Sequence, residues 1–418
     1  MRVIHLLRKL DPAEWSGTEV AVQRLFHGLR DHGVSPIAYC PRVNGDEASD
    51  PLSSSGFEVR RFKAFVPVLG LSKERRQQLV SVGGNLMSFE LVPSLWRERE
   101  VAVVHAHTLG RLGGVALTLA KQRRVPFVVT IHGGVLDLPT ELQTSFNSPL
   151  GEGWDWGKFF GLLFQSHRLF READAILTCN EREADLLRSQ LRNKRILVQP
   201  HAVPTDIYGE DRRPAARRAF PEICKSKVLL TVGRIDPVKN QGWLVEQAPA
   251  LLERHPGVLL VFAGPCTDEP YRLKLQRRIQ ELGLVDRVLL TGGMPSSDPR
   301  LIGLMQSAEV LILPSLSETF GLVLLEAWAA GTPVLSARAS GPAALVRPGQ
   351  NGWLFDLNEP AAFHELLDWT LAHPEQSREM ARRGAKLSEQ HSVPTLAGRM
   401  KVLYERLIEE KHALRDYS

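Results

Sequence analysis

Cysteines and long apolar runs are scarce in this sequence. The four cysteines lie far apart and in no metal-ligand spacing: Cys40, Cys179, Cys224 and Cys266. Thiols in this pattern are typical of reduced, cytosolic cysteines rather than of a disulfide framework. No run reaches the roughly 18 apolar residues that a membrane-spanning helix needs, and the apolar stretch within residues 1–10 is too short for a signal peptide. We therefore expect a cytoplasmic protein, with peripheral contact to the inner face of the membrane as an open alternative.

Nucleic-acid signatures are also missing. The sequence has neither the cysteine and histidine spacing of a zinc finger nor an aromatic RNA-binding pattern, and its basic clusters are scattered. The formal net charge of +5 favours anionic partners such as nucleotide phosphates or acidic lipid, but it does not choose among them. We expect no nucleic acid among the partners.

A regular alternation of short apolar runs with longer amphipathic stretches is what the sequence does have. This rhythm is typical of parallel sheets covered by helices. At 418 residues the chain is longer than one hydrophobic core usually grows, so two α/β domains are expected. The predicted strands are 3–7, 101–105, 127–130, 175–178, 196–198, 228–232, 258–262, 288–290, 310–313 and 333–335.

A proline-bounded segment, residues 200–204, interrupts this rhythm and is followed by a charged stretch. We place the domain boundary between residues 203 and 204. Each half, 1–203 and 204–391, then forms one doubly wound domain, and a ligand cleft is expected between the two. The end of the chain predicts an amphipathic helix whose apolar face needs a partner surface: Leu396, Met400, Leu403 and Leu407.

The segment 314–333 has the densest chemical pattern. It follows a predicted strand and runs into a helix, so the backbone N–H groups of Phe320, Gly321 and Leu322 should be available to an anion. Glu318 in the loop and Glu326 in the helix could both point at one ligand. The alternatives are that Glu318 caps the helix and that Glu326 is solvated. An unpaired charge among the apolar neighbours of Glu326 would be costly, which favours a ligand.

A second polar loop, residues 232–240, also follows a strand. Gly233 permits close backbone approach, and Arg234 and Lys239 offer two cations where such sheets bind ligands. A diphosphate would fit these cations. The alternative is a surface loop in which Arg234 pairs with Asp236.

The first half carries weaker signals. Gly17 after the first strand resembles a phosphate-binding turn only loosely, and a capping box of Ser16 and Glu19 explains the same residues. His132 ends a strand, where it could donate a hydrogen bond to a sugar hydroxyl or be structural.

Two further patterns in the first half have more than one interpretation. His105 and His107 form an H-x-H pair, but the sequence places no third ligand nearby, so we expect no metal. The polar stretch 136–157 leads into aromatic and apolar residues that could be a packed helix face, an acceptor groove or a membrane contact: Trp154, Trp156, Phe159, Phe160, Leu163 and Phe164.

Taken together, these motifs resemble the family 4 glycosyltransferases, retaining enzymes of the GT-B fold. The resemblance rests on Gly17, on Val103 to His107, on Thr-x-His-Gly at 130–133, on Gly-Arg-x-Asp-x-x-Lys at 233–239, and on Glu-Thr-Phe-Gly at 318–321 with Glu326-Ala and Gly331-x-Pro-Val. The chain departs from the family pattern at Ser16, at His201-Ala202 and at Ala343-Ala344.

The resemblance implies a role for each site residue. Arg234 and Lys239 would bind the donor diphosphate, and Glu326 the ribose hydroxyls. Glu318 and the backbone of 320–322 would hold the donor sugar and phosphate. From the first domain, Gly17 would approach the diphosphate and His132 the transferred sugar. The resemblance also implies that residues 392–418 cross back onto the first domain.

The resemblance implies a retaining glycosyltransferase that moves a sugar from a nucleoside diphosphate sugar to an acceptor hydroxyl, and we expect it to need no metal and no cofactor. The acceptor could be a glycan, a lipid-linked molecule or a small molecule, and neither the base nor the sugar of the donor can be read from the sequence. The alternatives are a nucleotide-sugar epimerase or hydrolase on the same scaffold, and a non-catalytic nucleotide-sugar-binding protein.

Overall fold

The computed structural model describes residues 1–10, 17–42, 51–70, 86–132, 154–155 and 157–416. The chain forms two compact units. The first consists of residues 1–201 and 393–418, and the second of residues 202–392. The chain thus passes between the units at 201/202 and again at 392/393, beside the expected boundary at 203/204 and the expected start of the returning helix at 392.

The first unit is built on a parallel seven-stranded sheet with the order β3-β2-β1-β5-β6-β8-β9. Its strands are β1 (Arg2–Leu6), β2 (Ser35–Pro41), β3 (Glu58–Phe62), β5 (Val101–Ala106), β6 (Phe127–Ile131), β8 (Ala175–Thr178) and β9 (Ile196–Val198). The chain moves outward from β1 to β3 and then returns to the other side of β1 with β5. The gap between β1 and β5 is therefore the switch point, where doubly wound sheets bind ligands.

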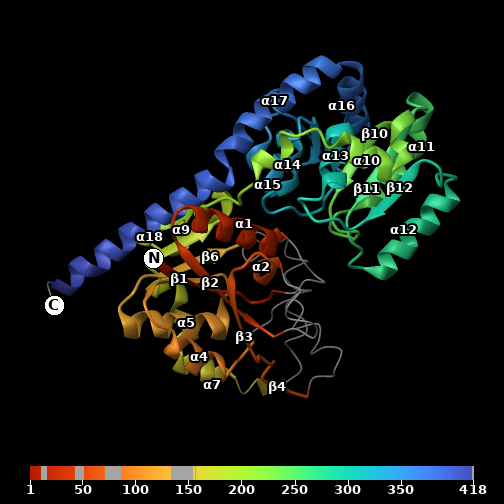
Figure 1. The fold of residues 1–418 in the computed structure, drawn as a ribbon. Helices are drawn as coiled ribbons and strands as arrows, with labels where there is room; N and C mark the ends of the chain where they lie inside the picture. Colours follow the sequence, from red (N-terminus) through yellow and green to blue (C-terminus); the bar gives the residue numbers. More distant parts are fainter. Residues whose placement is uncertain (11–16, 43–50, 71–85, 133–153, 156, 417–418) are drawn as a thin grey trace. The chain divides into compact units, whose positions relative to one another are not determined.

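Helices cover both faces of this sheet (Figure 1). Alternate residues of the central strands, such as Ile4 and Val104, pack against α5 (Gly110–Arg123) and α4 (Leu91–Arg97). Their neighbours Val3 and Val103 pack on the opposite face, against α1 (Gly17–Asp31) and α18 (Val393–Asp416). This division follows from the two-residue period of strands. The shorter helices are α2 (Pro51–Ser54), α7 (Lys158–Leu163), α8 (Leu169–Glu172) and α9 (Glu181–Gln190), and β4 (Val68–Leu69) pairs with β7 (Trp154–Asp155).

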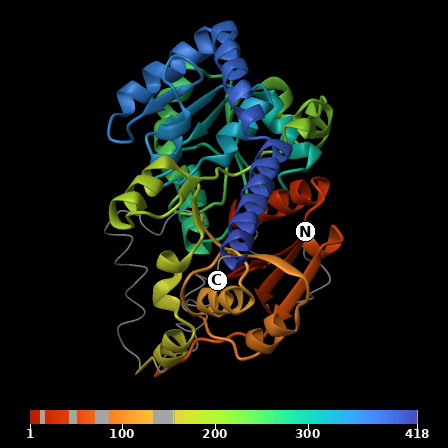
Figure 2. The ribbon, with the colours of Figure 1, turned by 90° about the vertical axis from the view of Figure 1, so that its left-hand side faces the viewer.

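The C-terminal helix α18 belongs to the first unit, as expected (Figure 2). It packs against α1 and buries one face in the core of this unit. The buried face contains Leu396, Met400, Tyr404 and Leu407, whereas Leu403 is only partly buried. The sequence predicts an apolar helix face that needs a partner surface. The structure shows that this face covers the sheet of a domain that begins almost 400 residues earlier in the chain.

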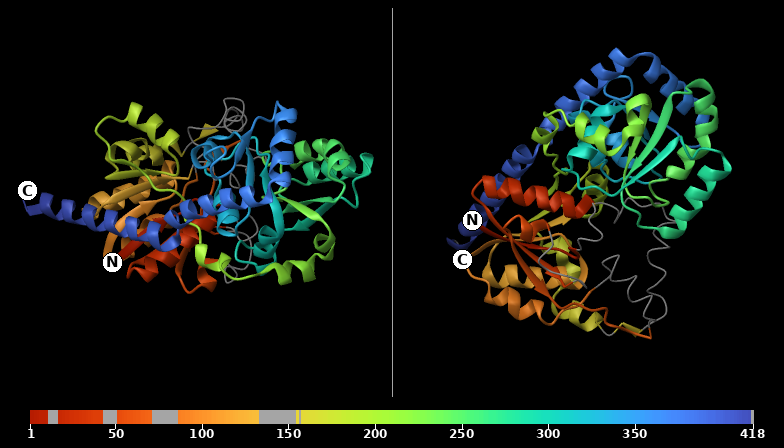
Figure 3. Two further views of the ribbon diagram at one scale, coloured as in Figure 1. Left: turned by 90° about the horizontal axis from the view of Figure 1, so that it is seen from above. Right: turned by 45° about the vertical axis from the view of Figure 1, so that its right-hand side comes forward.

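The second unit repeats this topology with a parallel six-stranded sheet, in the order β12-β11-β10-β13-β14-β15. Its strands are β10 (Lys227–Val232), β11 (Val258–Ala263), β12 (Val288–Gly292), β13 (Ala308–Leu313), β14 (Val334–Ala337) and β15 (Trp353–Phe355). The switch point lies between β10 and β13. Helices flank the sheet (Figure 3): α10 (Arg213–Ala219), α11 (Gln241–Arg254), α12 (Glu269–Glu281), α13 (Pro299–Ser307), α14 (Leu322–Ala329), α15 (Ser340–Leu345), α16 (Pro360–Ala372) and α17 (Pro374–Gln390).

Each predicted strand is present, within one or two residues of its expected ends. The fold is therefore the expected pair of Rossmann-like domains, while the cleft between them stays a prediction. Within the described residues, no helix combines the length and the apolar character needed to cross a membrane.

Candidate active site

Two loops meet at the switch point of the second unit. The loop after β10 and the loop after β13 follow neighbouring parallel strands, so both begin at the carboxyl ends of the strands. Two hydrogen bonds join them: the Leu316 N–H donates to the Val238 carbonyl over 2.9 Å, and the Asn240 side-chain amide donates to the Pro314 carbonyl over 3.1 Å. These bonds hold the two predicted polar motifs beside each other.

Lys239 and Glu318 form an ion pair across these loops, between Nζ and Oε2. Their side chains are 18% and 16% exposed, so both charges are largely withdrawn from water. The alternative in which Glu318 caps a helix is wrong, because Gly321 is the N-cap residue of α14 and no side chain caps it. The structure thus brings together a cation and an acid that lie far apart in the sequence.

Asp236 organises the loop that carries both cations. Its side chain is buried, and its Oδ1 accepts a hydrogen bond from the Lys239 backbone N–H at 2.9 Å. Its Oδ2 lies 3.1 Å from Nη2 of Arg234, whose own side chain is 43% exposed. The Arg234–Asp236 pair of the alternative interpretation is therefore present, but it is anchored on a buried acid and leaves the guanidinium open to a ligand.

Glycine is required at two positions around these loops. A Cβ on Gly264, after β11, would lie 2.0 Å from the carbonyl oxygen of Gly233, so the two backbones touch. Gly321 has φ of +88° and begins α14 in the left-handed region that other residues avoid. The chain turns sharply there, and residues 320–322 form the N-terminal start of a helix, where backbone N–H groups favour an anion.

Glu326 lies on α14 and is only 7% exposed. Its neighbours Leu325 and Ala327 are fully buried. The interpretation of Glu326 as a solvated surface residue is therefore wrong. A carboxylate in such surroundings has to be compensated by polar partners, and its predicted role in binding ribose stays a prediction.

At the switch point of the first unit, four imidazoles form a hydrogen-bonded chain. Nδ1 of His5 on β1 lies 2.9 Å from Nε2 of His107, which follows β5. Nδ1 of His107 lies 2.8 Å from Nε2 of His132, which follows β6. Nδ1 of His132 lies 3.2 Å from Nε2 of His201, the last residue of the first of the two segments that form this unit. We call this series of residues the histidine chain.

His105 lies beside the histidine chain but bonds elsewhere. Its Nδ1 lies 2.6 Å from the Tyr404 hydroxyl on α18, and its Nε2 lies 2.6 Å from Oγ1 of Thr130. Burial raises the pKa of Tyr404 well above its usual value, so the phenol keeps its proton and shares a hydrogen bond with Nδ1 of His105. The returning helix is thereby tied to the switch point.

Burial keeps these histidines neutral. It lowers the pKa of His5, His105, His107 and His132 well below the usual value near 6.5, and neighbouring imidazoles lower it further. Arg8 adds to the effect at His132. A neutral imidazole can donate one hydrogen bond and accept one, which suits neutral hydroxyl groups.

The structure supplies the third imidazole that the sequence did not place near the H-x-H pair. His5, His105 and His107 have ligand atoms within 4.8 Å of one another. Both ring nitrogens of His105 and of His107 already take part in hydrogen bonds. These bonds explain the cluster without a metal, and the absence of a metal from the reaction stays a prediction.

The other predicted residues of the first unit are less constrained. Gly17 is exposed at the start of α1, and Ser16, its capping alternative, lies outside the described residues. The aromatic stretch is only partly described, and Trp156 is not among the described residues. On α7, Phe160 is buried but Phe159 is 74% exposed and Leu163 61% exposed. A fully packed helix face is therefore wrong for this segment.

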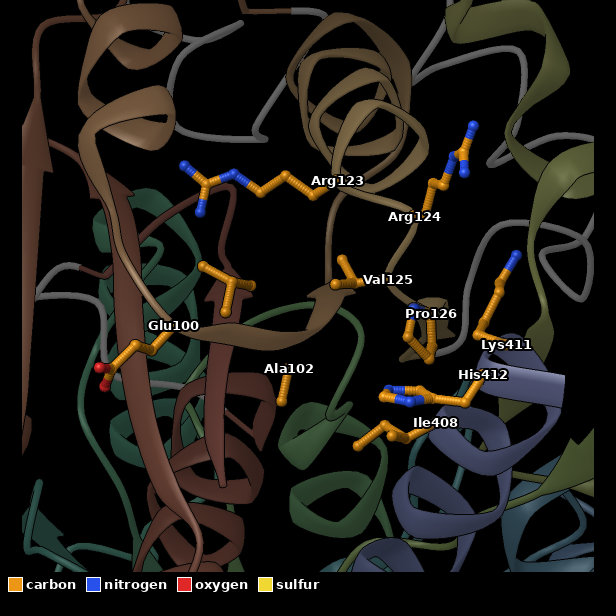
Figure 4. A pocket seen from close by; sticks show the side chains of 10 residues that line it. Glu100, Ala102, Arg123, Arg124, Val125, Pro126, Ile408, Lys411 and His412 are labelled. Atoms are coloured by element: carbon orange, nitrogen blue, oxygen red, sulfur yellow. The ribbon is translucent and has the colours of Figure 1, made fainter. Parts of the chain in front are cut away.

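A pocket of about 340 Å³ also lies in the first unit, at the amino-terminal end of β5 and thus away from the end of this strand that carries His107 (Figure 4). It is lined at the start of β5 by Val101 and Ala102, after α5 by Arg124, and on α18 by Ile408 and Lys411. Because ligands of doubly wound sheets bind at the carboxyl ends of the strands, this pocket is not the active site.

Comparison with known proteins agrees with this geometry. Residues 212–387 match the family of glycosyl transferases group 1, and residues 16–202 match the glycosyl transferase 4-like domain. A D-inositol 3-phosphate glycosyltransferase of Mycobacteroides abscessus is 33% identical over 383 residues, which are 89% of this chain and 79% of the relative. This chain belongs to family 4 of the glycosyltransferases.

Two further comparisons extend over nearly the whole family 4 chain. The D-inositol 3-phosphate glycosyltransferase 2 of Catenulispora acidiphila is 28% identical and covers 96% of this chain and 92% of its own. The crystal structure of Alr3699/HepE from Anabaena in complex with UDP has the same fold, with a TM-score of 0.73 at 18% identity, covering 97% of this chain and all of that one.

Membership of family 4 decides between the functional alternatives. The protein is a retaining, nucleotide-sugar-dependent glycosyltransferase with the GT-B fold, rather than an epimerase, a hydrolase or a binding module. The individual residue roles are not tested by these comparisons, and they are argued below from the geometry.

Proposed function

We propose that the second unit binds a uridine diphosphate sugar through Arg234 and Lys239, and that no metal takes part. The observation that carries this proposal is the meeting of the two polar loops at the switch point between β10 and β13. Arg234 is partly exposed there, Lys239 is held within reach of the same edge, and the start of α14 adds backbone donors. The UDP bound in the Anabaena protein supports the choice of base.

The chemistry explains why these cations matter. The bond between the anomeric carbon and the β-phosphate oxygen breaks, and the anomeric carbon bonds to the acceptor oxygen, whose proton leaves with the diphosphate. Negative charge therefore grows on the diphosphate, and fixed cations or a metal must stabilise it. Among the described residues of the second unit, no three potential metal-ligating side chains lie close together, which supports stabilisation by Arg234 and Lys239.

The remaining roles follow the shape of the donor. Glu326 accepts hydrogen bonds from the two ribose hydroxyls, because a carboxylate is an acceptor-only group suited to a diol. Glu318 contacts the donor sugar beside Lys239. His132 and Gly17 come from the first unit, so both units must close on the donor. We expect solution scattering to show compaction on addition of UDP, and an unchanged radius in a sample that starts open contradicts closure.

The acceptor is proposed to be the hydroxyl of a phosphorylated cyclitol. The names of the relatives, D-inositol 3-phosphate glycosyltransferases, support this choice at 28–33% identity. A first test is a thermal-shift screen of the protein with uridine, guanosine and adenosine diphosphate sugars. The selected donor is then incubated with D-inositol 3-phosphate, and the product is examined by mass spectrometry and by the proton coupling at its anomeric carbon.

The expected product is an inositol phosphate glycoside with the anomeric configuration of the donor. Inverted configuration contradicts a retaining reaction in this protein. If the enzyme glycosylates unphosphorylated inositol but not D-inositol 3-phosphate, the acceptor is not a phosphorylated cyclitol. Stabilisation by guanosine or adenosine diphosphate sugars, but not by uridine ones, corrects the base.

A lipid-linked acceptor is a second candidate, favoured by the surface of α7. Phe159, Leu162 and Leu163 are all more than 60% exposed there, and the helix begins with the exposed cation Lys158. Exposed apolar side chains beside a cation suit the interface of an anionic membrane. Flotation with phosphatidylglycerol vesicles tests this contact. Binding that disappears in Phe159→Ser/Leu163→Ser supports it, and equal flotation of this variant and the unchanged protein contradicts it.

A further inference from the structure

The histidine chain has a direction that its atoms dictate. Each link joins Nδ1 of the inner imidazole to Nε2 of the next outer one. A neutral imidazole carries one ring hydrogen, so every link needs its hydrogen from one side only. Only two arrangements satisfy all three links: every imidazole carries its hydrogen on Nδ1 and donates outward, or every one carries it on Nε2 and donates inward.

The inner end of the histidine chain decides between these arrangements. His5 is fully buried, and its Nε2 has no hydrogen-bond partner among the described residues. Phe26 and Tyr404 lie edge-on to its ring. Inward donation would leave a buried N–H without an acceptor, whereas outward donation leaves only a lone pair. Orphaned buried N–H groups are the rarer of the two in folded proteins, so outward donation is favoured.

Outward donation defines the state of His132, the residue that the proposed function places beside the transferred sugar. Its Nε2 accepts from Nδ1–H of His107 over 2.8 Å, and its own Nδ1–H donates to His201 over 3.2 Å. The outer link is longer and therefore weaker. Stacking of His107 on both His105 and His132 adds to the fixed orientation, with ring centroids 4.2 and 5.0 Å apart.

We propose that His107 is a positioning residue for sugar transfer: it commits His132 to donate from Nδ1, and His201 holds that N–H until a hydroxyl of the donor sugar takes it. This inference rests on the proposed function, in which His132 meets the sugar. His5 and His107 contribute by keeping the ring of His132 in one orientation.

The test compares substitutions at His107. His107→Asn keeps an amide donor near the position of Nδ1, whereas His107→Leu removes it. Acceptor-free hydrolysis of UDP-glucose, or of the donor that the screen selects, measures the reaction without an acceptor. We expect His107→Leu to lower kcat about tenfold or more, because a misplaced reactive group can cost up to about a hundredfold. His107→Asn should recover most of the loss, and UDP affinity should be equal in both variants.

Two matched variants separate hydrogen bonding from packing. His105→Gln alters an equally buried imidazole that stacks on His107 but is not hydrogen-bonded to His132, so its kcat should stay within about threefold of the unchanged enzyme. His201→Ala removes the group that competes with the sugar hydroxyl for the Nδ1–H of His132, so it should not raise KM for the nucleotide sugar. A loss in His105→Gln as large as in His107→Leu, or no recovery in His107→Asn, overturns the positioning role.

Nitrogen-15 spectra of labelled imidazoles test the direction without any activity measurement. For His132 we expect a protonated Nδ1 and an unprotonated Nε2 near neutral pH. The opposite assignment overturns outward donation, and a higher KM for the nucleotide sugar in His201→Ala overturns the exchange of partners. If the unchanged protein neither transfers sugar from a nucleotide sugar nor hydrolyses it, the proposed function fails. The spectra still decide whether the imidazoles of the histidine chain donate outward.

Discussion

The two switch points of this glycosyltransferase have the same topology and opposite chemistry. Between β10 and β13 lie the ion-pairing side chains of Arg234, Lys239 and Glu318, and the guanidinium is partly exposed. Between β1 and β5 lie neutral imidazoles, buried and linked to one another. A nucleotide sugar has the same two parts, an anionic diphosphate and a neutral polyhydroxylated ring. Each switch point suits one of them.

The largest expected effect comes from removing the cations at the switch point of the second unit. Arg234→Ala and Lys239→Ala should each lower turnover by about a hundredfold, because a preorganised charge on the leaving group is worth on the order of 3 kcal/mol in the transition state. Steady-state kinetics with the selected donor measures this. Arg278→Ala is the matched control, since Arg278 is paired with Glu246 on the helices of the same unit and should leave turnover unchanged.

A chelator tests whether these cations, rather than a metal ion, stabilise the leaving diphosphate. Activity should survive EDTA, and added magnesium should not rescue Arg234→Ala. Loss of activity in EDTA that returns with magnesium contradicts the assignment of the leaving-group charge to these cations. Near-normal turnover in both alanine variants removes Arg234 and Lys239 from the mechanism, whatever the chelator does.

The next effect concerns the buried acid of the second unit. Glu326→Gln should weaken UDP binding by about tenfold, because an amide accepts hydrogen bonds from two ribose hydroxyls less well than a carboxylate does. Isothermal titration with UDP and with 2′-deoxy-UDP measures this. The difference between the two nucleotides should shrink in the variant. Equal UDP affinity in Glu326→Gln and the unchanged protein excludes the ribose contact.

Acid should destabilise the histidine-rich switch point. The folded pKa values of His5, His105, His107 and His132 lie below 6.5, so below that pH the unfolded chain binds more protons than the folded one. Stability is then lost as pH falls from about 6.5 toward the folded pKa values, by at most about 1.4 kcal/mol per pH unit for each histidine.

Hydrogen exchange at two pH values, corrected for intrinsic rates, can locate this loss. Peptides from β1 and β5 should lose protection at pH 5 relative to pH 7.5. Peptides from β10 and β13 should lose less, since in the described part of the second unit the histidine with a lowered pKa is His364, which lies on α16 rather than on either strand. Equal loss in the two sheets contradicts this difference between the units.

The smallest effect concerns the tie between α18 and the first unit. Tyr404→Phe removes the hydroxyl that is hydrogen-bonded to His105 and leaves a buried nitrogen unpaired, at a cost of about 1–3 kcal/mol. Thermal unfolding of the variant measures it, with Tyr271→Phe as a control in the second unit, where the hydroxyl accepts a backbone N–H. Turnover should fall little, because the lost hydroxyl bonds to His105 outside the histidine chain, and phenylalanine keeps the ring beside His5. An unchanged melting temperature contradicts the tie.

Sequence periodicity predicted the strands that are continuous apolar runs and missed five of the described strands: β2, β3, β4, β7 and β15. The predicted strands are continuous apolar runs such as β11. Runs of this kind are buried away from water whichever strands lie beside them. β3 carries two arginines at the sheet edge, β2 has prolines near its ends, and β15 has three residues. Their strand state depends on pairing with an adjacent strand, which local pattern does not report.

The sequence by itself determined the doubly wound fold, the family and the residues of the charged motifs, because burial of apolar runs and the spacing of Gly233, Arg234 and Lys239 are local properties. Only the tertiary structure decided that Lys239 pairs with Glu318 and that Asp236 supports both cations. It alone joined His5, His107, His132 and His201, which four separate segments carry to the switch point of the first unit. Contacts of this kind depend on which strands lie side by side, and strand order is set by packing of the whole domain rather than by any local run of residues.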